Sequence, residues 1–337
     1  MLKPTGHDPE AVAQAARRLQ EGGLVGLPTE TVYGLAANAD QPEAVARIFA
    51  AKGRPSDHPL IVHVAGLQAA QWRAAVAHYA HDVPGFAERL MAAFWPGPLT
   101  LILPRQAGVA QTAAGGQDSI GLRCPAHPVA QALLQACQGL GVMGLAAPSA
   151  NRFGRVSPTT AAHVVDEFQG LLDHDELLVL DGGPCPVGIE STIIDCSRGH
   201  PVLLRPGVLT VAEIEQAMDE PLQAADAQAP RASGTLASHY APRARVRLMS
   251  AREMQTALDL LGADARHIAV YARQPITSAS HHVRIERMPD DARACAQELF
   301  AVLRALDRPE TRLIWVETPP ETTAWDGVRD RLQRAAA

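Results

Sequence analysis

Residues 23–65 constrain the fold more than any other stretch, because two apolar strand-like runs enclose a polar loop and a short helix. The first run covers 24–27 and stops at Pro28, and the helix begins near Pro42. The second apolar run covers 60–64. Apolar strands with polar groups at their ends are typical of a binding site on an α/β sheet.

Two cations flank the glycine at which this helix should end. Gly53 is a reasonable helix C-cap, with Lys52 before it and Arg54 after it. Such a pair suits a polyanion such as a nucleoside triphosphate. It equally suits a solvated helix end, where basic side chains are favoured anyway. These residues alone leave both interpretations open, and both side chains are expected to face solvent.

Composition limits the possible classes of protein. The 337 residues suffice for one large or two ordinary domains, and the net charge of −6 disfavours bulk adhesion to nucleic acid or anionic membrane. The N-terminal ten residues lack an apolar run, and nowhere do 18 apolar residues follow one another, so neither a secretory signal nor a membrane span is expected. Five scattered cysteines form no C-x-x-C pair, which predicts no metal site and a reduced, cytoplasmic compartment.

Element order divides the chain into three parts. Residues 1–220 predict a mixed α/β domain, whose strands include 141–147 and an antiparallel pair at 191–195 and 202–205. Residues 221–244 are rich in Ala, Gln, Pro and Ser and predict a linker. Residues 245–337 alternate strand and helix, ending in a helix over 322–335, and predict a small Rossmann-like α/β domain.

Familiar nucleotide and metal motifs fail on context. Gly139, Gly141 and Gly144 have the dinucleotide spacing, but they follow a helix and precede a strand, which is the reverse of the required order. No Walker A sequence occurs. His281 and His282 are interpreted as part of a solvated loop rather than as metal ligands.

Hydroxyls, amides and cations recur at the ends of the first domain's strands: Thr29, Thr31, His63, Ser119, Arg123, Ser149, Asn151, Ser191 and Arg205. Each one alone has an ordinary alternative as a turn cap, a core histidine or a surface ion pair. Together with the helix-end pair, the two arginines would hold several negative charges. No Ser/His/Asp or Cys/His set stands out, so the pattern favours chemistry by positioning and electrostatics, as in nucleotidyl transfer.

Seven segments resemble one known family in their order along the chain. They are PTETVYGLAANA, KGRPSDHPLIVHV, FWPGPLTLIL, GLRCPAHPVAQALL, APSANRFGRVSPTTAAHV, DGGPCPVGIESTIID and LLRPG. They resemble the YrdC-like catalytic domain of the threonylcarbamoyl-AMP synthase family over about 10–218. The linker ending GTLASHYAP and the domain after it resemble the long, two-domain form.

The resemblance implies a fold and a reaction. The expected fold is a twisted open mixed sheet of YrdC-like type with a positively charged concave face, followed by the small Rossmann-like domain. The expected enzyme is a nucleotidyltransferase that makes L-threonylcarbamoyladenylate and pyrophosphate from L-threonine, bicarbonate and ATP, with Mg²⁺ accompanying ATP. The tRNA threonylcarbamoyl-transfer machinery would use the product downstream.

The resemblance also assigns roles. Lys52 and Arg54 match the pair that contacts ATP phosphates and are the catalytic candidates. Threonine contacts are expected at Thr29, His63, Arg123, Ala147 and Ser191, although spacing does not decide between Thr29 and Thr31. ATP contacts are further expected at Ser119, Ala147, Ser149, Asn151, Ser157, Arg205 and Tyr240. His239 and Tyr240 resemble a segment that folds over the pocket, and Ser233 replaces an expected Pro, which predicts a looser lid.

Two alternatives remain at this stage. An RNA-binding module is disfavoured by the net charge and by the 4% aromatic content, so at most weak RNA binding is expected. A carbamoyl-transferring maturation factor would carry zinc-finger modules, and no C-x-x-C occurs in the sequence.

Overall fold

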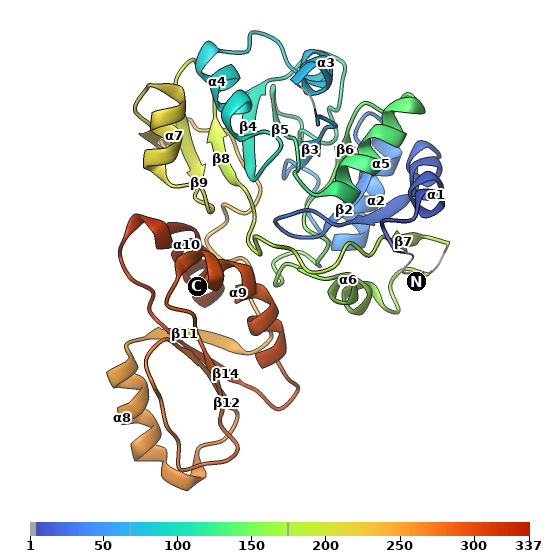
Figure 1. The fold of residues 1–337 in the computed structure, drawn as a ribbon. Coiled ribbons are helices and arrows are strands. Elements are labelled where there is room, and N and C mark those ends of the chain that lie inside the picture. Colours follow the sequence, from blue (N-terminus) through green and yellow to red (C-terminus); the bar gives the residue numbers. More distant parts are fainter. Residues whose placement is uncertain (1–4, 68, 174) are drawn as a thin grey trace. The chain divides into compact units, whose positions relative to one another are not determined.

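The structure is a computed structural model that describes residues 5–67, 69–173 and 175–337. The chain forms two compact units (Figure 1). Unit 1 comprises Met1–Phe153 and Ser157–Thr235, and unit 2 comprises Gly154–Val156 and Leu236–Ala337. The expectation that there is no secretory signal rests on the N-terminal ten residues, of which residues 1–4 lie outside the described residues.

Unit 1 alternates helices and strands along most of its length. Its elements are α1 (Pro9–Gln20), β1 (Leu24–Leu27), β2 (Gly34–Asn38), α2 (Pro42–Lys52), β3 (Ile61–His63), α3 (Ala69–Tyr79), α4 (Gly85–Phe94), β4 (Leu99–Pro104), β5 (Ser119–Arg123), α5 (Pro128–Gly139), β6 (Leu145–Ala146), α6 (Ala161–Phe168), β7 (Leu177–Val179), β8 (Thr192–Asp195), β9 (Val202–Arg205), α7 (Val211–Met218) and β10 (Gln223–Ala224).

In the described residues, ten strands of unit 1 form one mixed sheet in the order β10-β9-β8-β4-β5-β3-β6-β2-β1-β7. This confirms the predicted open mixed sheet, and β8 and β9 pair antiparallel as predicted. Strands β3 and β5 run parallel, with His63 opposite Arg123. Because paired residues point to the same face, these two side chains meet at one edge of the sheet.

Helices pack on both faces of this sheet. Helices α1 and α5 lie side by side (Figure 1) and bury Leu19 and Leu133 against β1 and β7. Helix α2 starts with Pro42 in its first turn, and Gly53 ends it at φ 60°. Glycine adopts this left-handed conformation without steric cost, which turns the chain sharply after Lys52.

Three differences from the predicted elements have physical causes. Strand β2 was not predicted, because its sequence GLAAN carries small residues of low strand propensity, and pairing with β1 and β6 holds it in place. The strand predicted over 141–147 is only two residues long, and Gly141 at its predicted start lies in a turn with φ 82°. In the predicted linker, β10 pairs with β9, so the linker begins as part of the sheet.

Unit 2 is a small parallel α/β sandwich. It contains β11 (Arg245–Met249), α8 (Ala251–Leu261), a 3₁₀ turn (Gly262–Asp264), β12 (Ile268–Ala272), β13 (Arg284–Arg287), α9 (Ala292–Leu306), β14 (Leu313–Glu317), a second 3₁₀ turn (Thr323–Trp325) and α10 (Asp326–Ala336). The helix predicted over 322–335 thus begins as the second 3₁₀ turn. The strand order is β11-β14-β12-β13, and all pairs are parallel, as expected for a Rossmann-like domain.

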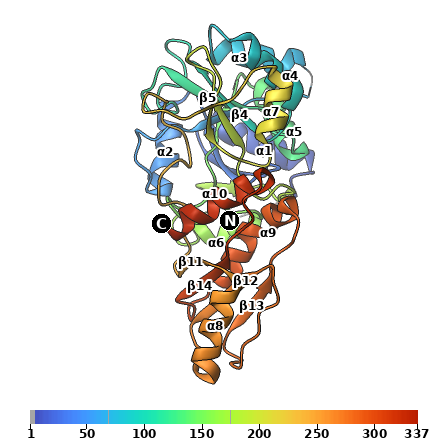
Figure 2. The same ribbon diagram turned by 90° about the vertical axis from the view of Figure 1, so that its left-hand side faces the viewer.

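Helix α8 covers one face of this small sheet, and α9 covers the other (Figures 1 and 2). Alternation along β12 explains the two layers, since Val270 packs with Leu258 of α8 while Tyr271 reaches Glu298 of α9 at 2.9 Å. Within the described ranges, no helix is long and apolar enough to cross a membrane.

Candidate functional site

The loop between β1 and β2 is organised by two buried threonine hydroxyls. Thr29 Oγ1 donates to the carbonyl of Val32 at 2.6 Å and accepts the N–H of Thr31 at 3.2 Å. The Thr31 hydroxyl lies 2.9 Å from that of Thr29. Since Thr29 already donates to Val32, Thr31 is the donor in this contact. This local turn explains why the chain after Pro28 leaves the strand and presents polar groups.

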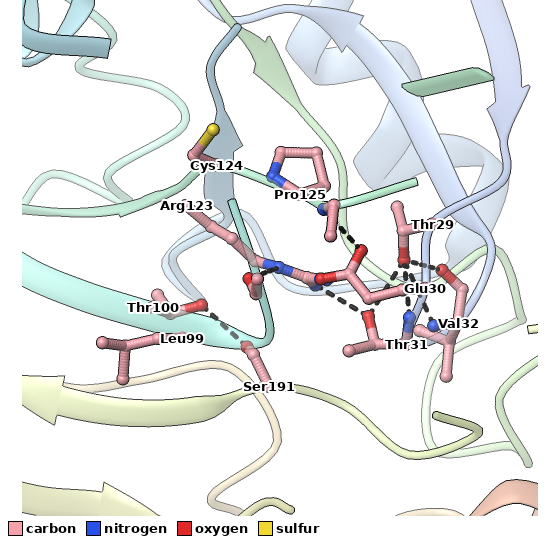
Figure 3. A network of polar contacts seen from close by, with 12 residues as sticks. Thr29, Glu30, Thr31, Val32, Leu99, Thr100, Arg123, Cys124, Pro125 and Ser191 are labelled. Carbon is pink, nitrogen blue, oxygen red and sulfur yellow. Dashed lines mark hydrogen bonds and ion pairs between the residues drawn. The ribbon is translucent and has the colours of Figure 1, made fainter. Parts of the chain in front are cut away.

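Arg123, at the end of β5, joins this loop through a buried ion pair (Figure 3). Its Nη2 lies 2.6 Å from Oε1 of Glu30, and its Nη1 donates to Thr31 Oγ1 at 2.7 Å. Glu30 Oε2 accepts the N–H of Ala126 at 3.0 Å. Both charged side chains are less than 10% exposed. The pair therefore fixes the guanidinium beside the hydroxyls, which is the geometry needed to orient a small anion.

His63 is a neutral buried neighbour of this pair. Burial, and secondarily the positive charge of Arg123, lowers the pKa of His63 to about 3. Its Nδ1 lies 3.3 Å from the carbonyl of Ile61 and donates to it. The ring thus contributes hydrogen-bonding atoms and no charge at neutral pH.

A second network crosses three neighbouring strands of the sheet. The hydroxyl of Ser191 lies 2.7 Å from that of Thr100 on β4 (Figure 3). Arg205, at the end of β9, donates from Nε and Nη2 to the carbonyl of Ser191 at 3.1 and 2.9 Å. Its Nη1 donates to the carbonyl of Ser233 at 2.9 Å. The two strand-end residues predicted here therefore touch each other.

The expectation that Lys52 and Arg54 face solvent is wrong. Lys52 is 3% exposed, and its Nζ donates to the carbonyls of Ser149 at 2.6 Å and Asn151 at 2.5 Å. Burial, and secondarily the nearby Arg54, lowers the pKa of Lys52 well below its usual value. The ammonium thus reaches the loop after β6, which a pattern read along the helix alone does not reveal.

Arg54 is 9% exposed and holds two separate segments of unit 1. Its Nη2 donates to the carbonyl of Pro59 at 2.9 Å and to Ser233 Oγ at 3.2 Å. The guanidinium carbon also lies 5.7 Å from the ring centre of Phe153. The side chain is thus oriented before any ligand binds.

A short segment of the predicted linker, Arg231–Ser233, lies on the sheet of unit 1, and we call it the strap. The side-chain amide of Gln117 accepts the N–H of Arg231 at 2.9 Å and donates to its carbonyl at 3.2 Å. Arg231 also pairs with Asp57 at 2.6 Å. Ser233 Oγ donates to the carbonyl of Pro59 at 2.8 Å. Ser233 therefore anchors the strap, contrary to the expectation that it loosens the lid.

The strap covers a small pocket on the sheet. The pocket is lined by apolar and hydroxyl groups of β3, β4, β5 and β8, together with the strap: Leu60, Ile61, Thr100, Ile102, Ser119, Gly121, Ile193, Arg231 and Ser233. Ser119 therefore lies in it, and Arg54 and Arg205 reach its rim through Ser233. Through Thr100, whose hydroxyl contacts that of Ser191, the pocket adjoins the second network described above.

Other predicted residues have mainly structural contacts. Ser157 donates to the buried carboxylate of Glu190. Ala147 is 5% exposed, and a Cβ on Gly34 would lie 3.1 Å from the Ala147 methyl group, so the backbone segments around Gly34 and Ala147 approach each other closely. Ser149 and Asn151 offer the carbonyls that hold the Lys52 ammonium.

His239 and Tyr240 belong to unit 2. Tyr240 is 1% exposed and left-handed at φ 61°, with the Arg331 guanidinium 5.4 Å from its ring centre and the Phe300 ring at 5.3 Å. The backbone N–H of His239 donates to the carbonyl of Arg334 at 3.1 Å. This segment is thus packed on α9 and α10 of its own unit.

Sequence reasoning did not select several residues of these networks. Glu30, Thr100 and Gln117 each pair with a predicted site residue or with the strap. The one available signal was Glu30, an acidic residue between the two loop threonines. Thr100 and Gln117 carried none, because their partners are distant in sequence.

Two known family models together match both units of this chain. A family profile described as "Telomere recombination" and named for Sua5, YciO and YrdC matches residues 17–207, and one described as "Threonylcarbamoyl-AMP synthase, C-terminal domain" matches residues 209–337. A threonylcarbamoyl-AMP synthase of Pyrococcus abyssi is 37% identical over 96% of this chain and 93% of its own. This chain belongs to the threonylcarbamoyl-AMP synthase family.

A second relative and a solved structure also match over both units. A threonylcarbamoyl-AMP synthase of Bacillus subtilis is 35% identical, covering 98% of this chain and 94% of the relative. The crystal structure of P. abyssi Sua5 in complex with L-threonine has a TM-score of 0.86 at 35% identity, covering 98% of this chain and 95% of that one. The family resemblance, the two-domain form and the predicted fold are thereby confirmed.

Proposed function

We propose that this chain makes L-threonylcarbamoyladenylate and pyrophosphate from L-threonine, bicarbonate and ATP. One observation carries the proposal: the similarity to proteins named threonylcarbamoyl-AMP synthase runs through both units, at 37% identity over 96% of the chain. The alternatives of an RNA-binding module and a maturation factor are not favoured by this end-to-end match.

The site residues suggest how the substrates would be held. The threonine carboxylate would take hydrogen bonds from Arg123, whose guanidinium the Glu30 ion pair already orients. The threonine hydroxyl would meet Thr29, Thr31 or the neutral ring of His63. A site that hydrogen-bonds this hydroxyl rejects analogues that lack it, because its own buried polar groups would be left unsatisfied.

The chemistry would then be one of positioning. The threonine amine takes up bicarbonate as a carbamate with loss of water, the carbamate oxygen attacks the α-phosphorus of ATP, and pyrophosphate leaves. Lys52, Arg54 and Arg205 would lower the repulsion between the triphosphate and the anionic nucleophile. Ser119, Ser149, Asn151 and Ser157 would line the nucleotide side.

Mg²⁺ would enter as part of the substrate. Among the residues that the structure describes, no group of three metal-ligating side chains is present. Mg²⁺ is commonly bound through substrate phosphates with few protein ligands, so these residues fit a Mg²⁺–ATP complex rather than a resident ion. Its chemistry is to neutralise phosphate charge.

Closure over the site would protect the carbamate, which is labile in water. The strap would serve this role, since it covers the pocket on the sheet and is held there by Gln117 and Pro59. Tyr240 as a contact to ATP and transfer of the product to the tRNA-modifying machinery remain predictions of the family resemblance. A cytoplasmic location remains a prediction from the scattered cysteines.

Pyrophosphate release by the purified chain with Mg²⁺ and ATP tests the proposal. Release should require both L-threonine and bicarbonate, and release that is indifferent to threonine would refute it. Arg54→Ala should lower turnover about 10²-fold or more. Arg47→Ala, an exposed arginine on the preceding helix α2, is the matched control and should leave turnover unchanged. Because Arg54 is buried, circular dichroism must first show that the variant is folded.

A further inference from the structure

Unit 2 contains a hollow that the proposed synthesis does not use. Its volume is about 550 Å³, which lies within the usual range for small-ligand pockets. It opens where the chain enters strands β12, β13 and β14. We call it the basin, and its basic and imidazole side chains are Arg266, His267, His281, His282, Arg284 and Arg308.

The basin is rich in positive charge. Three arginines line it against one acid, Glu310. Arg266 has Asp264 at 3.6 Å and Arg284 has Glu286 at 2.7 Å, but neither of these acids lines the basin, and exposed pairs of this kind are weak. Three guanidiniums around one hollow suit a multiply charged anion and repel a metal cation.

His267 is fixed in an unusual conformation at the basin. Its φ of 61° is left-handed, which is uncommon outside glycine and is found repeatedly at functional sites. Its Nδ1 donates to the carbonyl of Glu310 at 2.7 Å, and its own carbonyl accepts the N–H groups of Arg312 and Leu313 at 2.9 and 3.0 Å. The ring is therefore anchored by one nitrogen, and Nε2 is the atom left for a ligand.

Two more imidazoles complete the basin. His281 and His282 are exposed, as the sequence predicts for this loop, and their ring centres lie 4.1 Å apart with an interplanar angle of 40°. Exposed imidazole faces next to guanidiniums offer both hydrogen bonds and a flat surface for a base. An extended RNA strand needs a continuous basic track, whereas these side chains converge on one hollow.

We propose that the basin binds a small phosphate-bearing ligand of nucleotide size, through residues of unit 2 alone. The arginines would bind the phosphate oxygens, and the imidazoles would contact the rest of the ligand. This site is independent of the proposed synthesis and would give unit 2 a ligand of its own.

Hydrogen exchange of the full-length protein, read by mass spectrometry, tests this. The probes are AMP, pyrophosphate and a ten-nucleotide single-stranded RNA without terminal phosphates. AMP or pyrophosphate should slow exchange in peptides covering 264–269, 280–286 and 307–313. Replacing both Arg266 and Arg308 by Ala should weaken this protection about tenfold or more. The control pair Arg247→Ala and Arg252→Ala, exposed arginines of unit 2 outside the basin, should leave it unchanged.

Three outcomes would overturn the proposal: protection by RNA alone, no protection in these peptides at millimolar AMP or pyrophosphate, or equal weakening in the control pair. Ligand at the synthase site would appear in peptides of unit 1, so the two sites are read separately. Pyrophosphate release by the basin variant should stay within about twofold of the parent, whichever way the synthesis proposal is decided.

Discussion

The two hydrogen bonds between the Gln117 amide and the strap lead to a prediction that can be tested without substrate. The amide of Gln117 bonds both backbone groups of Arg231, and Arg231 is also the residue after which trypsin cleaves this segment. A protease needs the segment extended and free, so cleavage at the Arg231–Ala232 bond reports opening of the strap. Gln117→Ala removes both hydrogen bonds and leaves the Ser233 contacts in place.

The size of the effect follows from those two bonds. Each neutral hydrogen bond contributes about 0.5 to 1.5 kcal/mol, so the variant should favour opening by about 1 to 3 kcal/mol. That corresponds to roughly 5- to 150-fold more open strap, because 1.4 kcal/mol is tenfold. The Asp57 ion pair is exposed on both sides, at 53% and 59%, and adds at most about 1 kcal/mol.

Limited trypsin digestion followed by mass spectrometry measures this opening. When opening is fast relative to cleavage, the cleavage rate tracks the open population. Gln117→Ala should therefore be cut after Arg231 at least about fivefold faster than the parent. Gln106→Ala, an exposed glutamine on the same loop, serves as the control. A Gln117→Ala rate within twofold of the parent would show that the amide does not hold the strap.

Two further predictions concern buried groups of unit 1. Glu30→Gln leaves Arg123 as an unpaired buried charge, so urea unfolding should show that the free energy of unfolding of unit 1 falls by about 3 to 5 kcal/mol. The control Glu88→Gln, at an exposed position, should change it little. A loss below about 1 kcal/mol for Glu30→Gln would contradict the buried ion pair. His63 has a folded pKa of about 3, below its unfolded value near 6.5. Between these pH values only the unfolded chain binds the extra proton, so the free energy of unfolding decreases by about 1.4 kcal/mol for each unit by which the pH is lowered. From pH 7 to 5 the parent should therefore lose about 2 kcal/mol more than His63→Gln, and equal losses would refute a neutral buried His63.

The strand-end residues could be predicted because apolar runs mark strands directly. Arg123 and His63 were expected at strand ends, and the structure pairs them across β3 and β5. Ser191 and Arg205 likewise meet across β8 and β9. Hydrophobic patterning is local information, so it identifies where a strand stops and which polar group follows.

The partners of these residues could not be predicted, because they depend on the tertiary fold. Lys52 looked like a solvated helix end, yet its ammonium is held by carbonyls about a hundred residues later in the chain. Strand β2 was missed because its small residues carry no strand signal, and only its neighbours hold it extended. Gln117 contacts the strap from 114 residues away.

The attachment of the strap to the sheet has a kinetic consequence. Strand β10 ends at Ala224, and only the six residues 225–230 separate it from Arg231, so Arg231 of an open strap can lie no farther than about 25 Å from Ala224. Reclosure is therefore intramolecular, at an effective concentration on the order of millimolar or above, and it is insensitive to dilution. In the closed strap, Arg54 and Arg205 each donate a hydrogen bond to Ser233. A ligand that needs these donors must displace Ser233, so its apparent affinity equals its affinity for the open form multiplied by the fraction of molecules in which the strap is open.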